Sequence, residues 1–415
     1  MVVAVAVAVA LSSTADGASR RKRPATAARP EDRSGPPAPP PNDALLTEER
    51  TVALPGRGMG LAWAPDGHAL AVGGHFRDRT TRLRYDTRVY DLASDALERS
   101  YSCHWFWVIA LAWAHNPYLG EVIVDGGGDH AVKVWDANGP GSTRCVPGQL
   151  PPEDGGIRQM GEINGWITSL NFSPDGRFLA GTSRDRAVHI WQVASGRNQW
   201  KRVGMYYDDD ASNFLALAWA PDGRHFVTAD HRGRVIMWPF DPSTDLWDDE
   251  TVARAANVSY ESHFSWCHAN APVVTHTPLW SEGNHRTVWG VDYSPDGTRV
   301  AAASADGFVS VFDAATGHVV FRTGAPRVTA FHSLDWSADG RFLAAGAADK
   351  RVYVFDAANG RLRDVLAGHA DVVTTVAWSP DGRRLASVAG GPLLSFASLE
   401  FAVGPDMTLR LWTWR

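Results

Sequence analysis

The residues best suited to metal chemistry lie in a long stretch at about residues 241–284. His263, Cys267, His268 and His276 are residue types that bind zinc in proteins. Three residues separate His263 from Cys267 and seven separate His268 from His276, which matches no paired zinc-ligand spacing. We therefore expect no metal, and keep a metal-dependent binder or an enzyme built on residues 241–285 as an alternative function.

Other catalytic signatures do not occur in the sequence. There is no nucleophile elbow and no phosphate-binding glycine loop followed by a helix. The run Gly126-Gly127-Gly128 lies between two apolar strand patterns, so it predicts a turn at a strand end rather than a phosphate cradle. The sequence thus predicts no catalytic residue and no cofactor.

The elements that position these residues come from a repeated turn. Seven turns of the Ser-Pro-Asp-Gly type interrupt an apolar strand pattern, beginning at Ala64, Ala114, Ser173, Ala220, Ser294, Ser337 and Ser379. The spacings are 50, 59, 47, 74, 43 and 42 residues, and the last two match the period of a four-stranded propeller blade. The Phe331–Gly360 segment has the clearest unit, with strands at 331–336, 342–345 and 352–355.

A second repeated mark ends the third strand of each unit. An Asp stands six residues before an aromatic residue in five units, from Asp129 to Trp135, Asp185 to Trp191, Asp306 to Phe312, Asp349 to Phe355 and Asp406 to Trp412. This pattern resembles the WD-repeat β-propellers over roughly residues 46–415. The resemblance implies an all-β, seven-bladed propeller of four-stranded antiparallel blades. A rival family, the TolB-like propellers, shares the turn but lacks the Asp-to-Trp ending.

The resemblance also implies a buried hydrogen-bonded set in each blade. In the family this Asp joins a His, a Ser or Thr, and the Trp indole. His104 and His369 occupy the His position in the second and last blades, ten residues before the turn. Ile163 and Arg327 occupy it elsewhere, so the set is incomplete in those blades.

Ring closure has a candidate device. Thr51 to Leu54 forms a strand-length apolar pattern just before the first turn, while only three residues follow Trp412. We expect residues 48–54 to complete the last blade as its outer strand, because an unpaired sheet edge would otherwise remain.

The same resemblance implies a partner-binding rim. Family members commonly hold peptides or domains at the starts of first strands and at the turns between second and third strands. By position these are Phe106, Trp107, Trp166, Arg184, His231, Arg232 and Arg286. Trp and Arg dominate binding hot spots, so the expected function is a non-catalytic scaffold for peptides or domains within a multiprotein complex.

Composition restricts the partners. The net charge of −6 gives no reason to expect nucleic acid, so we expect protein partners and a propeller that is monomeric within a hetero-complex. The three cysteines are odd in number and far apart, which favours a reducing compartment, cytoplasmic or nuclear.

Residues 1–45 differ from the rest of the chain. Their Ala, Pro and Arg bias cannot build a core, which predicts a disordered or targeting tail. The apolar run Val2 to Leu11 is too short to span a bilayer, although a signal or transit peptide stays open. A cleaved signal would fit a weaker alternative, an extracytoplasmic TolB-like sensor.

Overall fold

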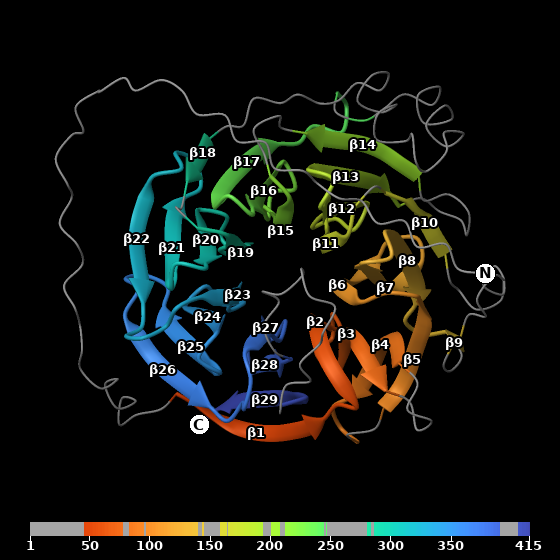
Figure 1. The fold of residues 1–415 in the computed structure, drawn as a ribbon. Helices are drawn as coiled ribbons and strands as arrows, with labels where there is room; N and C mark the ends of the chain where they lie inside the picture. The colour runs from red at the N-terminus through yellow and green to blue at the C-terminus, as the bar shows by residue number, and fades with distance from the viewer. Residues whose placement is uncertain are drawn as a thin grey trace, which may run out of the picture. The chain divides into compact units, whose positions relative to one another are not determined.

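A computed structural model describes residues 45–77, 83–94, 97–139, 143–144, 158–163, 165–193, 201–207, 212–244, 246, 280–283, 286–390 and 406–415. All of them lie in the second of the two units into which the chain divides, Pro37–Arg415. Seven antiparallel sheets stand around a central axis in this unit (Figure 1). The predicted seven-bladed propeller is therefore confirmed.

The first three blades follow chain order. Blade one holds β2 (Gly56–Trp63), β3 (Ala69–Arg77), β4 (Leu83–Asp91) and β5 (Leu97–His104), with β9 (Thr143–Arg144) added parallel to β5. Blade two holds β6 (Val108–Asn116), β7 (Gly120–Gly127), β8 (Ala131–Asp136) and β10 (Arg158–Glu162). Blade three holds β11 (Ile167–Phe172), β12 (Phe178–Ser183), β13 (Ala187–Gln192) and β14 (Lys201–Tyr207).

The remaining blades repeat this order. Blade four holds β15 (Phe214–Trp219), β16 (His225–Asp230), β17 (Arg234–Pro239) and β18 (Trp280–Gly283). Blade five holds β19 (Val288–Tyr293), β20 (Arg299–Ser304), β21 (Phe308–Asp313) and β22 (Val319–Gly324). Blade six holds β23 (Phe331–Trp336), β24 (Phe342–Ala347), β25 (Arg351–Asp356) and β26 (Leu362–Ala367). Blade seven holds β27 (Val373–Trp378), β28 (Arg384–Ala389), β29 (Thr408–Trp414) and β1 (Leu46–Ala53).

Six of the seven predicted turn segments form the tight turn between the first and second strands of a blade. In blade two the segment from Ala114 to Asn116 instead belongs to β6, and the turn follows at 117–119. In blade three the Ser173 hydroxyl donates to Asp175 Oδ1 at 2.6 Å and accepts from the Phe178 N–H at 3.0 Å. Gly176 closes the turn with φ of 66°, a left-handed conformation that favours glycine. The turn sequence therefore sets the register in which the two inner strands pair.

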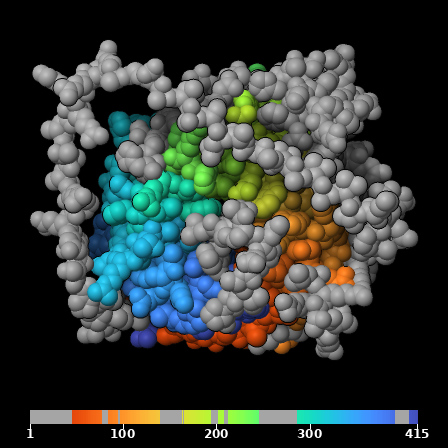
Figure 2. Space-filling model, viewed as in Figure 1, coloured from red at the N-terminus to blue at the C-terminus, as the bar shows by residue number. Residues whose placement is uncertain are grey.

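The ring is closed by the first strand of the described chain. β1 pairs antiparallel with β29, from Leu46 opposite Trp414 to Ala53 opposite Thr408. In Figure 1 the strand lies along the outside of β29, and in Figure 2 the first and last coloured segments meet at the lower edge of the ring. The expected closure by residues 48–54 is confirmed, with the strand beginning two residues earlier.

Polar contacts fix β1 on two sides. The buried carboxylate of Asp364, on β26 of blade six, accepts the backbone N–H groups of Leu45 at 2.7 Å and Leu46 at 2.8 Å. Within blade seven, Glu48 pairs with Arg410, and Glu49 with Arg384. The closing strand is thus bonded to its own blade and to the preceding one.

Apolar packing joins every blade to the next. Seven buried clusters account for the core, and each combines side chains of two neighbouring blades. One cluster, for example, packs Leu70 and Val72 of blade one against Val388 and Leu411 of blade seven. No blade buries both of its faces alone, so the ring is stable only as a whole.

Two half-buried aspartates bridge seams, Asp292 from blade five to blade six and Asp335 from blade six to blade seven. Asp292 accepts the N–H of Trp336 in the next blade at 2.8 Å, and Asp335 accepts that of Trp378. Burial raises the pKa of Asp292 to about 6. Burial and the neighbouring Asp292 carboxylate raise the pKa of Asp335 as well.

Blade one extends its second hairpin into a charged part of the sequence, residues 77–86. Its strand β3 continues through Arg77, and β4 begins at Leu83. The pairing of Phe76 with Arg84 carries the ladder into the charged stretch, and the Arg88 guanidinium lies 4.5 Å from the Phe76 ring centroid. Strand pairing here outweighs the polar composition.

Cys103 on β5 is disulfide-bonded. The inference that the cysteines are reduced is therefore wrong for this residue. The spacing of three cysteines along the chain could not reveal it, because only the folded ring decides which thiols meet. The described residues contain no helix that could cross a bilayer.

Two expected regions lie outside the described residues. They are the N-terminal tail to residue 44 and most of the insertion at about 241–284, from 247 to 279. The division of the chain into a tail, a propeller and an insertion remains a proposal.

Closure predicts a large effect at Asp364. Asp364→Ala should lower the free energy of unfolding by about 2–4 kcal/mol, because two buried backbone N–H groups lose their acceptor. Urea denaturation measures the change. Arg363→Ala, an exposed neighbour, should change it by less than about 0.5 kcal/mol. Equal effects of the two substitutions would contradict a role for Asp364 in closure.

The raised pKa values of the seam aspartates Asp292 and Asp335 predict that removing one of the two carboxylates stabilises the protein. A carboxyl whose pKa is raised on folding destabilises the fold as pH rises from its unfolded value, near 4, through the folded value. Asp335→Asn keeps an acceptor for Trp378 N–H without the charge, so it should raise the unfolding free energy by about 1–3 kcal/mol at pH 7.5 and by less at pH 4. Asp381→Asn is the control, because the pKa of Asp381 is lowered by its hydrogen bonds despite partial burial. A gain in the control, or none at Asp335, would count against the seam pair.

Candidate functional site

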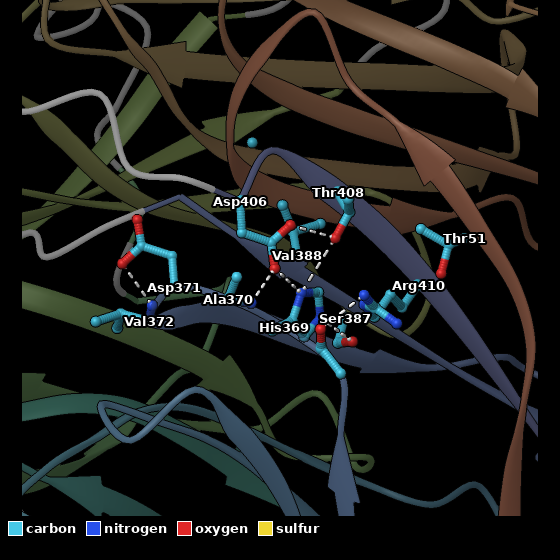
Figure 3. Close-up of polar contacts among 12 residues, drawn as sticks. Thr51, His369, Ala370, Asp371, Val372, Ser387, Val388, Asp406, Thr408 and Arg410 are labelled. Carbon is cyan, nitrogen blue, oxygen red and sulfur yellow. Dashed lines mark hydrogen bonds and ion pairs between the residues drawn. The ribbon is translucent and has the colours of Figure 1, made fainter.

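Blade seven contains a complete buried hydrogen-bonded set (Figure 3). His369 Nδ1 lies 3.0 Å from Asp406 Oδ2, and His369 Nε2 lies 2.8 Å from Ser387 Oγ. The Trp412 indole N–H donates to the same Ser387 hydroxyl at 2.9 Å. The set links the connection before β27 to β28 and β29, so it orders this end of the blade.

Asp406 is held ionised in this set. Burial alone would raise its pKa, but hydrogen bonds from His369, the Thr408 hydroxyl and the Ala370 N–H together lower the pKa to about 2. The charge-assisted bonds keep the connection to β27 in place at any pH near neutrality.

Blade two uses charges where blade seven uses a hydroxyl. His104 Nδ1 lies 2.8 Å from Asp129 Oδ1, and Nε2 lies 2.9 Å from Asp125 Oδ1. Asp125 occupies the register of Ser387, and its other oxygen accepts the Thr87 hydroxyl of blade one at 2.6 Å. Lys133 contacts Asp129 at 4.0 Å. Two carboxylates are thus balanced by an imidazolium and an ammonium.

We call Asp125, Asp129 and Lys133 around His104 the blade-two cage. The cage determines the pKa of His104. Burial alone would lower it, but the charges of Asp125 and Asp129 and their hydrogen bonds raise the pKa to about 9. His104 is therefore positively charged at neutral pH. Its position in the sequence suggested a hydrogen-bonding partner for Asp129, but not the second carboxylate.

The other blades use the same Asp position in different ways. Asp185 pairs with His189, while Asp306 pairs with Arg322, and Asp349 accepts the Tyr353 hydroxyl. The Trp135 and Trp191 indole N–H groups have no partner in the described part of the chain. In blade four, which has no such Asp, the Trp238 indole N–H donates to Thr228 at 2.8 Å, a pair that sequence reasoning missed.

We call the upper face the end of the ring where each first strand begins and each second strand turns into its third. Four of the expected rim residues meet there, at blades two and three. The centroid of the Phe106 ring lies 5.2 Å from that of Trp107 and 5.5 Å from that of Trp166. The Trp107 and Trp166 ring centroids lie 6.1 Å apart. The Arg184 guanidinium lies 4.5 Å from the Trp166 ring centroid.

Two rings of blade one extend this group. Tyr85 stacks on Phe106 and His75 stacks on Trp107, each with centroids 6.0 Å apart. We call His75, Tyr85, Phe106, Trp107, Trp166 and Arg184 the aromatic cluster. It combines half-buried rings of three blades with one guanidinium, an arrangement suited to apolar and cation–π contacts.

A glycine makes room for the cluster. A Cβ on Gly128, in the turn after β7, would lie 2.2 Å from Phe106 Cδ1. Only glycine therefore lets the Phe106 ring lie against this turn. The glycine run has the structural role that its position between strands indicated.

The other three expected rim residues form a separate, exposed group at blades four and five. His231, Arg232 and Arg286 are all exposed, and the Thr287 hydroxyl donates to the His231 carbonyl at 2.9 Å. The ring contacts given above for the cluster involve none of these three residues. The upper face thus has an aromatic part and a basic part.

Sequence reasoning missed one prominent upper-face residue. Trp105 is 72% exposed, directly between His104 and Phe106, and its N–H donates to Asp129 at 3.1 Å. An exposed tryptophan is rare enough to be informative. Its place beside the Gly-His position could have marked it.

The four possible zinc ligands, His263, Cys267, His268 and His276, lie outside the described residues. In the described ranges no three His, Cys, Asp or Glu side chains lie close enough to hold a metal ion.

Protein-family comparisons agree with the ring. The family model "WD domain, G-beta repeat" matches residues 158–192, 276–313 and 360–413. The chain is thus similar to the WD-repeat β-propellers over these three segments. The "Anaphase-promoting complex subunit 4 WD40 domain" model also matches residues 323–381 of the propeller.

Relatives carry the same repeat over part of their length. The propeller is 28% identical to Protein HIR1 of Yarrowia lipolytica, over 46% of this chain and 22% of that protein. It is 28% identical to WD repeat-containing protein 1-B of Xenopus laevis, over 37% and 24% respectively. It is 27% identical to WD repeat-containing protein SL1-17 of Schistosoma mansoni, over 54% and 47%. The chain thus matches less than half the length of each relative.

The blade-two cage predicts a pH dependence. A histidine whose pKa is raised on folding adds stability that is complete below its unfolded value, near 6.5, and is lost as pH rises through about 9. The unfolding free energy should therefore fall by about 1–3 kcal/mol between pH 6 and pH 9.5. His104→Gln should remove most of this fall. The same slope in both proteins, measured by urea denaturation, would contradict a charged His104.

Proposed function

We propose that this WD-repeat propeller is a non-catalytic scaffold that binds peptide segments or domains of other proteins on its upper face. The aromatic cluster carries the proposal, because it gathers three aromatic rings and an arginine that the family resemblance assigns to the rim. Trp, Tyr and Arg are the residue types that dominate binding hot spots. The exposed ring of Trp105 adds an anchor beside the cluster.

The rigidity of the face supports this role. Phe106 and Trp107 follow His104, whose two carboxylate partners fix the connection between blades one and two. Preorganised side chains lose little conformational entropy on binding. The basic group at His231, Arg232 and Arg286 would then select the partner's charge on the other half of the face.

We further propose protein partners rather than nucleic acid, a monomeric propeller within a hetero-complex, and a cytoplasmic or nuclear location. The net charge of −6 supports the first of these. The disulfide at Cys103 is typical of an oxidising compartment, so it counts against a cytoplasmic or nuclear location. Cell fractionation with tagged protein therefore tests the location independently of binding.

The binding proposal predicts selective loss of partners. Trp105→Ala combined with Arg184→Gln should reduce co-purifying partners about tenfold, because two anchor contacts are removed. Quantitative mass spectrometry after affinity capture from native cells measures the change. The unfolding temperature should fall only slightly, since Trp105 is exposed and the half-buried Arg184 is replaced by another polar residue.

Tyr118→Ala provides the matched control. Tyr118 is 50% exposed in the turn between β6 and β7, at the opposite end of the blade. The control should retain the partners. Loss with the control, or retention with the upper-face variant, would place the binding surface elsewhere.

A further inference from the structure

Three polar side chains at the central channel have hydrogen-bonding atoms without partners. His332 on β23 is 4% exposed, and neither of its ring nitrogens has a partner within the described chain. The same holds for the Trp289 indole N–H on β19 and the Ser333 hydroxyl on β23. The His332 and Trp289 rings lie 5.7 Å apart.

Other blades handle this register position differently. The residues equivalent to His332 include the apolar Leu215 and the polar Thr168 and Thr374. Thr168 donates to the Phe214 carbonyl at 2.8 Å, and Thr374 donates to the Gly58 carbonyl at 3.3 Å. The fold can therefore satisfy or avoid a polar group here. A buried polar group without a hydrogen-bond partner lowers the stability of the fold. A bound ligand would supply the missing partners of His332 and Trp289.

The channel wall defines the chemistry of that ligand. The channel has a volume of about 230 Å³, and its described lining includes Trp289, His332, Ser333, Trp166 and Arg184 but no Asp or Glu. The indole N–H can only donate, while the hydroxyl and a neutral imidazole each offer one donor. Arg184 is the one side chain of this described lining that is charged at every pH. Donors and a positive charge without a carboxylate fit an anionic acceptor.

We propose that the central channel binds a carboxylate group through the Trp289 indole N–H of blade five, the Ser333 hydroxyl and a His332 ring N–H of blade six, with Arg184 of blade three on the other side of the channel. The carboxylate belongs to a small organic acid or to an acidic residue of a peptide. Burial lowers the pKa of His332 to about 4, so the imidazole of the free protein is neutral at pH 7. Its second nitrogen remains as an acceptor for a ligand hydroxyl or amide N–H.

This inference is tested at other residues than protein binding on the upper face. The channel lining shares Trp166 and Arg184 with the aromatic cluster, but His332, Trp289 and Ser333 are not members of the cluster. Substituting these three residues leaves Trp105 and the cluster residues unchanged. Loss of channel binding and loss of partner capture are thus separate outcomes.

Thermal unfolding of the intact chain with added ligands tests the proposal. The probes are succinate, L-glutamate and the acetylated, amidated peptide Gly-Glu-Gly, each paired with its amide counterpart, namely succinamide, L-glutamine and Gly-Gln-Gly. At least one carboxylate should raise the unfolding temperature while its amide does not, and calorimetry should show saturable binding. Binding by the free acids indicates an organic acid as the ligand, whereas binding by the peptide alone indicates an acidic peptide.

Substitutions in the channel should separate ligand binding from folding. His332→Phe and Trp289→Phe should each abolish the ligand-induced shift. His332→Phe should also raise the unfolding temperature of the free protein by about 2 °C or more, because it removes unpartnered buried groups. A residue with a purely structural role would not give this gain.

Thr375→Val is the matched control in the same channel. The Thr375 hydroxyl already donates to the Met59 carbonyl at 2.6 Å. This variant should lower the unfolding temperature and keep the ligand-induced shift. If no carboxylate stabilises the protein at millimolar concentration, or if His332→Phe keeps the shift, the proposal is wrong and channel water alone satisfies these groups.

Discussion

The pairing of β1 with β29 is the constraint on which the rest of the propeller depends. Seven sheets that bury apolar side chains only against their neighbours form a stable core when the seventh also meets the first. β1 completes the outer edge of blade seven, and Asp364 of blade six fixes its start. The two ends of the described chain thus stabilise each other, and β29 is covered by β1 instead of being an edge strand.

Closure has consequences for the upper face. The aromatic cluster draws rings from three blades, and its ring distances exist only while the seams hold these blades in register. The buried hydrogen-bonded groups also differ from blade to blade. Blade seven uses a neutral hydroxyl at Ser387, and blade two uses the carboxylate of Asp125 with its charged partners. The same ring thus forms with different buried polar groups in different blades. Its exposed side chains can therefore vary with the binding partner without loss of the fold.

The sequence predicted the features that depend on local pattern. Turn spacing and strand alternation gave the seven blades, and the apolar pattern of residues 51–54 gave closure. Contacts between distant segments were not predictable in the same way. Tyr85 meets Phe106 and Thr87 meets Asp125 only because blade one packs on blade two. The Cys103 disulfide and the strand through Arg77 likewise depend on pairing that composition does not encode.

Hydrogen exchange of the intact chain, followed by mass spectrometry, tests the closed ring most directly. In a closed ring the amides of β1 should exchange as slowly as those of β29, since both open only when blade seven opens. Asp364→Ala should speed exchange in β1 and β29 together. Fast exchange throughout β1 beside a protected β29 would contradict closure, and with it the rigid upper face that the proposed function requires.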